Sequence, residues 1–494
     1  MILKQDHWSD FGFQTMFDAR LYISKTMASI ELGPVKIMKK GQKSGLTEIS
    51  QHFSRLDDTY CSLGQAYSYY EALHNLPTQI RQAVLVGLRD MAFDASIREA
   101  FENEPAISIS LLRYGNAELA LRDATSLFEE SSQERSSSLA FNFQTNVGGG
   151  PFEIDLKFVD RLPLPGRINA IIGYNGCGKT QLLGNLANAA HADLHQRNSN
   201  SFSVKYGRFL GDNAELRFSS VVAVSYSAFD TFDLPGKNQE EEDRLAETGE
   251  VSGYVYCGLR RYVRNGAGEI GRHSLKGIEE IHDEITMALE RARSSERRPR
   301  LLAALAPLTQ EPSFQRVGLT GSFALDDADW GHAFNKLSTG HKLVLNIIVQ
   351  LVAHLEPGSL VLIDEPESHL HPPLLAAMMR SLNVLLEEFD SYAVAATHSP
   401  VLLQELPSRY VHVLQRFGDS TDTSRPEVET FGENVGLLTR HVFNLDSSAT
   451  DFHSTLRSMN ETLSLHEITE LFDGELSAQS LAYLTSIGRE RNQP

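Results

Sequence analysis

Residues 173–180, Gly-Tyr-Asn-Gly-Cys-Gly-Lys-Thr, constrain the fold of this 494-residue chain more than any other segment. They fit the pattern Gly-x4-Gly-Lys-Ser/Thr, in which glycines let successive backbone N–H groups turn inward around anionic oxygens. A short apolar run at residues 168–172 precedes the segment, and a helical pattern at residues 181–189 follows it. A buried strand, this loop and a helix whose N-terminus faces the same anion together predict a phosphate-binding loop.

The residue types in this loop predict its ligands. Lys179 can reach the β- and γ-phosphates of a nucleotide, and the Thr180 hydroxyl can ligate Mg²⁺. An ordinary glycine turn, the alternative, does not account for the strand before the loop and the helix after it. We therefore expect ATP and Mg²⁺ as cofactors. The residues expected at the nucleotide are Asn175, Gly176, Cys177, Gly178, Lys179, Thr180 and Gln181.

Two carboxylates end an apolar run at residues 359–365, Ser-Leu-Val-Leu-Ile-Asp-Glu. The run predicts a buried strand, which places both carboxylates at the carboxyl edge of a sheet, where α/β folds bind ligands. Asp364 can hold the Mg²⁺ coordination shell, and Glu365 can orient or deprotonate the attacking water. Such a strand end is common by itself. Together with Lys179 upstream, it indicates an ATPase site.

A serine and a glycine begin a predicted helix at residues 337–341, Leu-Ser-Thr-Gly-His. Ser338 lies 26 residues before Asp364, and the helix has an apolar face through Leu343, Ile347 and Leu351. A helix start of this kind presents N–H groups, a hydroxyl and a positive dipole end to an anion. Serine and glycine cap many helices. Ser338 and Gly340 are candidate phosphate-binding residues only because they lie shortly before the acidic strand.

A histidine ends another apolar run at residues 393–398, Ala-Val-Ala-Ala-Thr-His. A lone histidine at a strand end is usually structural. Beside a phosphate loop and an acidic strand, we interpret His398 as a polar sensor of the γ-phosphate. The predicted catalytic residues are therefore Glu365, His398 and Lys179, with Thr180 and Asp364 as metal ligands.

Composition limits where the protein works and what it binds. The formal net charge of −19 opposes non-specific binding to nucleic acid or to an anionic membrane. Cys61, Cys177 and Cys257 are far apart and predict neither a disulfide framework nor a zinc site. The N-terminus does not resemble a signal peptide, and no apolar run is long enough to span a bilayer. We expect a cytoplasmic protein without a membrane partner.

Sequence patterns divide the chain into five predicted parts. A Ser-rich stretch at residues 131–138 and the glycines at 148–150 give the clearest linker signal. The predicted parts are a mixed α/β region at 1–146 with a regulatory or partner-binding role, the first part of an ATPase head at 147–236, a helical insert with a basic patch at 237–330, the second part of the head at 331–432, and a helical region at 433–494.

Together the motifs at 173–180, 337–341, 359–365 and 398 resemble the ABC-type ATPase head, a P-loop NTPase. The continuation Asp-Glu-Pro-Glu-Ser-His-Leu-His-Pro at residues 364–372 resembles the soluble branch that contains RecF, SMC and Rad50-like proteins and the OLD-like ATPases of antiphage systems. The resemblance covers nearly half of the chain. It implies an α/β fold with a mixed sheet flanked by helices.

In that branch two heads enclose two nucleotides. The resemblance implies that Lys179, Thr180, Asp364, Glu365 and His398 of one subunit face Ser338 and Gly340 of another, in a homodimer or a higher homo-oligomer. The sequence departs from the family twice. Residues 226–230 occupy the place of the Q-loop without its glutamine, for which Ser227 or Asp230 can substitute, and His341 replaces the usual signature glutamine. Slow turnover is compatible with both departures.

Weaker motifs resemble a narrower group. The segments Asp-Phe-Gly-Phe-Gln-Thr near the start, Ala-Phe-Asp-Thr-Phe-Asp at residues 228–233 and Phe-Gly-Glu-Asn at 431–434 are similar to the ATPase subunit of Septu-type defence systems or retron-linked relatives. That resemblance implies a separate HNH-type effector nuclease. The chain shows no nuclease motif of its own, so another chain is expected to perform any cleavage.

Two other groups of residues have competing interpretations. The cations between Arg260 and Arg300 lie beside tyrosines and are a candidate nucleic-acid surface, but a solvated insert with ion pairs explains them as well. His369 and His371 have the spacing of metal ligands. They also occupy the place of the dimer-contact loop in the ABC branch, and we favour that interpretation.

The function predicted from the sequence is that of a Mg-ATP-dependent ATPase that dimerises through its nucleotides and controls an effector nuclease in antiphage defence. One alternative is a RecF-like or Rad50-like DNA-repair ATPase that binds DNA directly. Another is the motor subunit of a membrane transporter, which the long segment between Thr180 and Leu337 and the N-terminal region disfavour.

Overall fold

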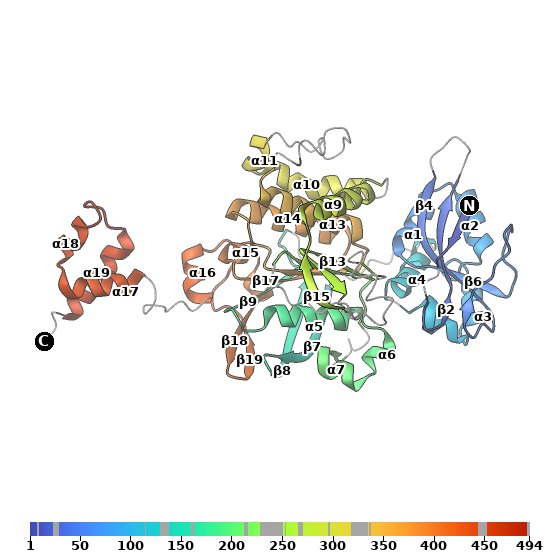
Figure 1. Cartoon of the computed structure of the whole chain (residues 1–494), viewed down its shortest axis with the longest axis horizontal. Helices are drawn as coiled ribbons and strands as arrows, with labels where there is room; N and C mark the ends of the chain where they lie inside the picture. The colour runs from blue at the N-terminus through green and yellow to red at the C-terminus, as the bar shows by residue number, and fades with distance from the viewer. Residues whose placement is uncertain are drawn as a thin grey trace.

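The computed structural model describes residues 1–6, 9–22, 29–113, 115–128, 138–159, 163–211, 216–227, 250–251, 253–264, 270–294, 297–317, 334, 337–442 and 452–491. Figure 1 shows three successive parts: an N-terminal domain, a central head and a small C-terminal group of helices.

A large sheet forms the centre of the head. Its strands are β9 (Ile168–Gly173), β11 (Val221–Ser225), β12 (Glu250–Val251), β13 (Tyr254–Gly258), β16 (Leu360–Asp364), β17 (Tyr392–Thr397), β18 (Val411–Phe417) and β19 (Ser420–Ser424). Their spatial order is β12-β13-β11-β16-β17-β9-β18-β19. The six inner strands are parallel, and the two edge strands pair antiparallel with their neighbours. This mixed sheet confirms the predicted α/β P-loop class.

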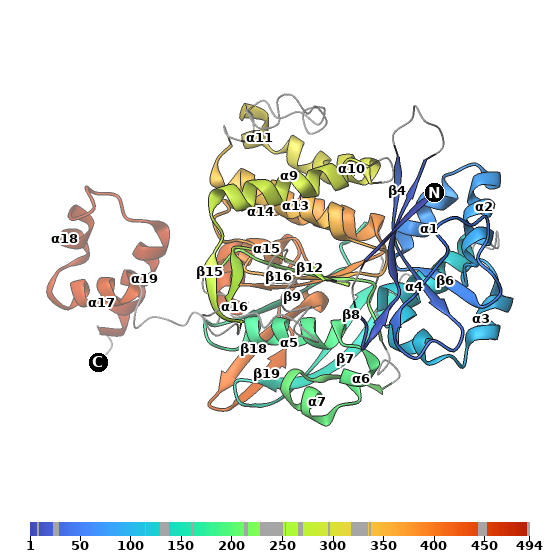
Figure 2. The ribbon, with the colours of Figure 1, turned by 45° about the vertical axis from the view of Figure 1, so that its right-hand side comes forward.

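The apolar strand sequences follow from burial on both faces of this sheet. Along β16, Val361 and Ile363 join the core on one side, while Leu360 and Leu362 join the core on the other. The first side is covered by helices and the second by one helix and a small antiparallel sheet (Figure 2). The helices of the first side are α9 (Ile278–Ala292), α10 (Arg298–Gln310), α13 (Thr339–His354) and α14 (Pro372–Glu388). The second side has α5 (Lys179–His191) and the strands β7 (Ser138–Val147), β8 (Gly150–Val159) and β10 (Arg208–Leu210).

The structure differs from the predicted linker at residues 148–150. Gly148 and Gly149 have φ angles of 66° and 98°, and they form the tight turn of the β7–β8 hairpin. Because β7 pairs with β8 along its whole length, the predicted boundary at 146/147 falls inside one structural unit. The Ser-rich stretch lies outside the described residues, apart from Ser138 at the start of β7.

The segment at 237–330, predicted to be a helical insert, contains strands as well as helices. Its strand β13 is part of the central sheet, and β14 (Arg260–Arg264) pairs with β15 (Ile270–Leu275) as a hairpin. The helical pattern through Ile281, Ile285 and Leu289 is α9, whose buried face packs on α13. The acidic run at residues 240–243 lies outside the described residues. Helix α11 (Pro312–Val317) follows α10.

Four antiparallel strands form the main sheet of the N-terminal domain. They are β1 (Ile2–Gln5), β3 (Met16–Leu21), β4 (Ile30–Lys39) and β6 (Tyr60–Gly64), in that spatial order. The domain adds the short strands β2 (Phe13–Gln14) and β5 (Gly45–Leu46), a π-helix (Ile107–Leu111), and the helices α1 (Tyr67–His74), α2 (Thr78–Leu88), α3 (Ala95–Phe101) and α4 (Gly115–Phe128). These elements enclose a core of their own.

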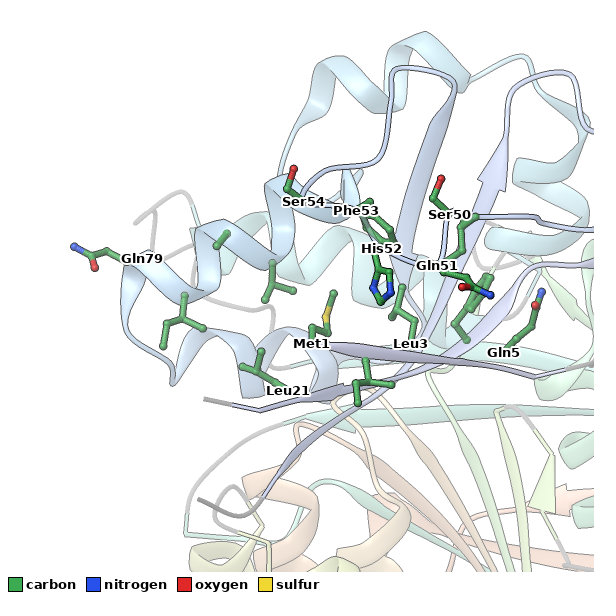
Figure 3. A pocket seen from close by; sticks show the side chains of 17 residues that line it. Met1, Leu3, Gln5, Leu21, Ser50, Gln51, His52, Phe53, Ser54 and Gln79 are labelled. Carbon is green, nitrogen blue, oxygen red and sulfur yellow. The ribbon is translucent and has the colours of Figure 1, made fainter. Parts of the chain in front are cut away.

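A half-open cavity of about 840 Å³ opens between this sheet and α2. Figure 3 shows the ring of His52 pointing toward Met1 and Leu3 inside it. The cavity is lined by Met1, Ile2, Leu3, Gln5, Phe17, Leu21, Ile49, Ser50, Gln51, His52, Phe53, Ser54, Gln79, Ile80, Ala83, Val84 and Gly87.

The remaining elements are short helices around the head and the C-terminal group. Around the head lie α6 (Leu194–Arg197), α7 (Asn200–Tyr206), α15 (Pro400–Gln404), a 3-10 helix (Ser408–Tyr410) and α16 (Val435–Val442). The C-terminal group, α17 (Phe452–Thr462), α18 (Leu465–Glu470) and α19 (Ala478–Arg491), packs around Leu456, Ile468 and Leu484. In the described parts of the chain, we find no helix of the length and apolarity that a membrane crossing requires.

Candidate functional site

The phosphate loop joins β9 to α5, as the sequence predicts, and glycine backbones give it its shape. Gly176 and Gly178 have φ angles of 81° and 98°, which side-chain-bearing residues rarely adopt. A Cβ on Gly178 would also lie 2.2 Å from Val147 Cγ1 of the β7–β8 hairpin, whereas a Cβ on Gly176 would meet nothing within 4 Å. The loop therefore packs against the hairpin at Gly178 and is open at Gly176.

Lys179 is the first residue of α5, and its ammonium lies at the mouth of the loop. Its Nζ donates to the carbonyls of Gly173 at 3.0 Å and Tyr174 at 3.3 Å, and to His398 Nε2 at 2.6 Å. Burial lowers the pKa of Lys179 below its usual value, and the nearby carboxylates of Glu365 and Asp364 offset part of this effect. The ammonium is therefore held between the loop backbone and His398.

Oxygen ligands suited to Mg²⁺ converge next to the lysine. Thr180 Oγ1 donates to Asp364 Oδ2 at 2.8 Å, although the two residues come from α5 and the end of β16. A hydroxyl and a carboxylate are the donors that Mg²⁺ takes from proteins beside phosphate oxygens. The two residues predicted as metal ligands are therefore in contact, and their chemistry fits the ion.

Glu365 and His398 face each other across the ends of β16 and β17. The two strands are parallel neighbours, with Asp364 opposite Ala396, so the residues that follow them meet at one edge. His398 Nε2 lies 3.6 Å from Glu365 Oε1. Burial and the neighbouring Lys179 lower the pKa of His398, while Glu365 acts in the opposite direction. Glu365 also has a φ of 49°, a strained backbone conformation of the kind that collects at functional sites.

Glu367 supports this edge and was missed by the sequence analysis. Its carboxylate accepts hydrogen bonds from Thr397 Oγ1 at 2.9 Å and from the backbone N–H of His398. Burial raises the pKa of Glu367, and these hydrogen bonds counteract part of that shift. Glu367 lies within the motif at residues 364–372, but the motif does not reveal its role, because its hydrogen-bond partners come from another strand.

Arg416 is a second residue that the sequence analysis missed. Its guanidinium donates to the carbonyl of Gly176 at 3.2 Å and to that of Gly148 at 3.0 Å. Gln181, predicted at the nucleotide, instead accepts a hydrogen bond from the Gly148 N–H through its side chain at 3.1 Å. The β7–β8 turn, the phosphate loop and β18 are thereby held together.

Two of the other predicted loop residues differ in exposure. Asn175 is exposed to solvent. The side chain of Cys177 is buried beneath it, and its sulfur lies 2.7 Å from the position of a Cβ on Gly173. Cys177 can therefore contribute its backbone to phosphate binding, while its side chain packs under the loop.

The predicted signature residues lie at the start of α13, in the helical layer over the sheet. Ser338 caps this helix by accepting from the His341 N–H at 3.4 Å, and its Oγ lies 2.7 Å from His341 Nδ1. A Cβ on Gly340 would come within 3.0 Å of the His369 carbonyl. The loop that follows Glu365 therefore packs directly on the start of α13.

His371 has a structural role in that loop. Its Nδ1 accepts from the Leu374 N–H at 3.2 Å and so caps α14. Across the part of the chain that is described, no cluster of three or more His, Cys, Asp or Glu side chains is arranged to hold a metal ion. The dimer-contact interpretation of His369 and His371 stays a prediction.

The Q-loop place is described only in part. Tyr226 is buried, and its hydroxyl accepts from Asn346 Nδ2 of α13 at 2.9 Å, which makes it a core residue. Of the two residues expected to replace the glutamine, Ser227 is described and Asp230 lies outside the described residues.

Most of the basic segment is engaged within the molecule. Arg297 donates to the carbonyls of Val352 and Leu355 at 2.7 Å and 2.8 Å. Further ion pairs join Lys276 to Glu284, Arg261 to Glu280, Arg297 to Glu356 and Arg300 to Glu71. The side chains of Arg264 and Arg272 lie outside the described residues. These contacts favour the ion-pair interpretation over a surface that binds nucleic acid.

Known proteins resemble this chain in the same regions. Residues 331–404 match the family described as "AAA domain, putative AbiEii toxin, Type IV TA system", a stretch that includes Ser338, Asp364, Glu365 and His398. Protein ea59 of Escherichia phage lambda is 31% identical over 528 aligned positions, which cover 99% of this chain and 95% of that protein.

Two solved structures are among those that the chain resembles. A nucleotide-free ATP-binding cassette from an ABC transporter is 14% identical, with a TM-score of 0.30 over 58% of this chain and 92% of that one. The protein cbiO1 of Clostridium perfringens, part of the ABC transporter complex cbiONQ, is 15% identical, with a TM-score of 0.31 over 68% and 99%. The strand order of the central sheet, the phosphate loop and the family match at residues 331–404 assign a P-loop ATPase domain to this chain.

Proposed function

We propose that this chain, which belongs to the same family as Protein ea59 of Escherichia phage lambda, is a Mg-ATP-hydrolysing switch that dimerises through bound nucleotide. The observation that carries the proposal is the convergence of predicted groups at one sheet edge. Thr180 Oγ1 lies 2.8 Å from Asp364 Oδ2, and Lys179 Nζ lies 2.6 Å from His398 Nε2.

Each residue at this edge has a role that its position supports. Thr180 and Asp364 would hold Mg²⁺, which when bound neutralises phosphate charge. Lys179 and the N–H groups of the loop bind the β- and γ-phosphates. Glu365 orients the attacking water and accepts its proton, while His398 contacts the γ-phosphate. Most of the rate enhancement would come from positioning and charge stabilisation.

In the proposed dimer, a second copy adds donors at the γ-phosphate. Ser338 and Gly340 begin a different element, α13, which lies in the helical layer rather than in the phosphate loop. We propose that they complete the site of a second copy, with the N–H groups at the start of α13 facing its γ-phosphate. The loop through His369 would then link the two nucleotide sites of the dimer. It follows Glu365, which serves its own subunit's site, and it packs on Gly340, which serves the site of the second copy.

The test is the variant Glu365→Gln with ATP and Mg²⁺. Loss of a general base typically costs at least about 100-fold in turnover, so the variant should retain ATP and sediment as a stable dimer. Lys179→Ala is the matched control, which should lose nucleotide binding and stay monomeric. Parent-like hydrolysis by the glutamine variant would remove Glu365 from this role.

We propose further that dimer closure controls a separate effector, expected to be an HNH-type nuclease in a cytoplasmic antiphage system. The N-terminal domain supports a regulatory role, because it contacts the head next to β16. The Ser68 N–H donates to Glu356 Oε2 at 3.1 Å, a few residues before that strand begins. Purification of the native protein tests this proposal. A nuclease chain that accompanies it would support effector control, DNA alone would favour the repair ATPase, and a membrane protein would favour the transporter motor.

A further inference from the structure

Four side chains form a continuous hydrogen-bonded chain behind the signature serine. Ser338 Oγ lies 2.7 Å from His341 Nδ1, and His341 Nε2 lies 2.7 Å from Ser313 Oγ. Ser313 Oγ in turn donates to Glu311 Oε2. Glu311 ends the turn after α10, Ser313 is in α11, and the other two residues are in the first turn of α13. The His341 ring is buried, with its centroid 4.4 Å from that of Phe314 in an edge contact, so its position is fixed.

The direction of each hydrogen bond follows from the carboxylate at one end. An ionised carboxylate can only accept, and Glu311 Oε2 accepts from the Ser313 hydroxyl and from the N–H groups of Ser313 and Phe314 at 2.7 Å and 3.2 Å. The single hydroxyl proton of Ser313 therefore points at Glu311. His341 Nε2 must then donate to Ser313, which leaves Nδ1 of a neutral ring as an acceptor.

These hydrogen-bond directions determine where the hydroxyl proton of Ser338 points. With Nδ1 as an acceptor, the Ser338 proton points at His341, and only oxygen lone pairs face outward. Lone pairs oppose a γ-phosphate, which needs donors. When His341 is protonated, Nδ1 becomes a donor to Ser338, and the serine hydroxyl can turn its own proton toward a phosphate oxygen.

We propose that Glu311, Ser313 and His341 are positioning residues that set the direction of the Ser338 hydroxyl, and that closure of the dimer takes up a proton at His341 of each subunit. This inference rests on the proposed function, because it requires Ser338 to approach the nucleotide of a second copy.

Two titratable groups act on the His341 ring among the residues that the structure describes. Glu311 raises the pKa of His341, and His371, at the start of α14, lowers it. Burial is the largest influence, and the pKa of His341 is lowered overall. The ring is therefore neutral at pH 7 to 8 before closure. Glu311 stays ionised at pH 7 to 8. Burial raises its pKa, but the hydrogen bonds that it accepts lower the pKa by more.

The experiment measures the dissociation constant of the ATP-bound dimer in the Glu365→Gln background at pH 6.5 and pH 8.0. The dimer should be tighter at pH 6.5, by up to about tenfold per pH unit for each proton taken up. Glu365→Gln/His341→Gln is the matched control, since an amide N–H can donate to Ser338 at either pH. For this control, the dissociation constants at pH 6.5 and pH 8.0 should be nearly equal.

For a second variant, Ser313→Ala, we predict tighter dimerisation at pH 8.0. Ser313→Ala removes the acceptor of His341 Nε2, so a neutral ring can carry its proton on Nδ1 and donate to Ser338. In the same background this variant should dimerise at pH 8.0 at least as tightly as its parent does at pH 6.5.

Equal pH ratios for the parent and the His341→Gln variant would overturn the relay, as would a Ser313→Ala dimer that is weaker than its parent at pH 8.0. If Glu365→Gln stays monomeric with ATP at both pH values, the nucleotide dimer itself is wrong, and this result is distinct from the other two.

Discussion

At the scale of single residues, the phosphate loop depends on two requirements that meet at Gly178. The backbone needs a positive φ there, and the hairpin side chain Val147 leaves no space for a Cβ. Positive φ alone costs a non-glycine residue about 1–2 kcal/mol, whereas a steric clash next to a ligand displaces the backbone that binds it. The two effects can be separated by experiment, because Gly149 has the same φ of 98° and nothing within 4 Å of its Cβ position.

We predict that Gly178→Ala abolishes ATP binding, while Gly149→Ala lowers the stability by about 1–2 kcal/mol and leaves ATP binding nearly intact. Calorimetric titration with ATP and thermal unfolding check both variants. If Gly178→Ala and Gly149→Ala lose ATP binding equally, then strain in the β7–β8 turn, and not the contact with Val147, determines the conformation of the phosphate loop.

A buried carboxyl in the N-terminal domain predicts a pH dependence of stability. Burial raises the pKa of Asp90 from 3.8 to about 7, although it accepts from Tyr70 Oη at 3.0 Å and from the N–H groups of Ala92 and Phe93 at 2.9 Å and 3.1 Å. Because the folded pKa lies above the unfolded one, its contribution is fully present below pH 3.8. It is lost progressively as the pH rises to about 7, by up to about 1.4 kcal/mol per unit.

Asp90→Asn should remove this pH dependence. Hydrogen exchange of β6, corrected for intrinsic rates and compared at pH 5 and pH 7.5, should show protection that falls with pH in the parent more than in the variant. The same slope in both proteins would mean that Asp90 does not titrate in this range.

At the scale of elements, the active edge depends on how the ends of parallel strands are held. Three groups that are distant in sequence meet because β16, β17 and β9 are adjacent and in register. Glu367 then fixes the end of β17 relative to the turn after β16 through Thr397 and His398. We expect Glu367 to position His398 rather than to contact the substrate.

We predict that Glu367→Gln lowers kcat for ATP hydrolysis roughly 10- to 100-fold, with a much smaller change in KM, because a buried hydrogen bond to a charged group contributes about 1.5–3 kcal/mol. Glu405→Gln is the control: burial also raises the pKa of Glu405, but it lies beyond α15 and makes no contact with the site residues described above. Steady-state kinetics test both variants. A change confined to KM would place Glu367 at the bound nucleotide instead.

At the scale of the whole molecule, the N-terminal domain and the head meet through charged groups. Arg300 of α10 forms two hydrogen bonds with Glu71 of α1, at 2.9 Å and 3.2 Å, and both side chains are mostly buried. Glu356 accepts from Ser68 of α1 and pairs with Arg297. Glu356 precedes β16, whose other end carries Asp364, so a rigid strand connects this interface to the catalytic edge.

We predict that Glu71→Arg weakens domain docking by placing two cations together, and that Glu71→Arg/Arg300→Glu restores part of it. Chemical crosslinking between the domains and ATPase rates measure the effect. Glu31→Arg serves as the control, because Glu31 pairs with Arg20 on an exposed surface and should contribute little. If the double variant is no better than the single one, the Arg300–Glu71 pair does not hold the domains together.

The sequence alone determined the local chemistry of the head. The glycine pattern around Lys179, the apolar run before Asp364 and the strand before His398 are local, because backbone torsion, strand burial and helix capping depend on neighbouring residues. These patterns correctly predicted the P-loop class. They also predicted Thr180 and Asp364 as ligands of one metal ion; the structure brings the two side chains into contact, and the metal role stays a prediction. The pairing of the predicted signature residues with a second copy stays a prediction.

Only the tertiary structure decided which residues support that chemistry. Glu367, Arg416, Glu311, Ser313 and His341 act through partners on other elements. The sequence motifs include Glu367 and His341, but no local pattern reveals what these side chains contact. Tertiary contacts also turned the expected glycine linker into a hairpin turn and paired many cations of the basic segment with acids. Long-range packing sets such contacts, because a hydrogen bond or ion pair across the fold depends on where distant segments come together.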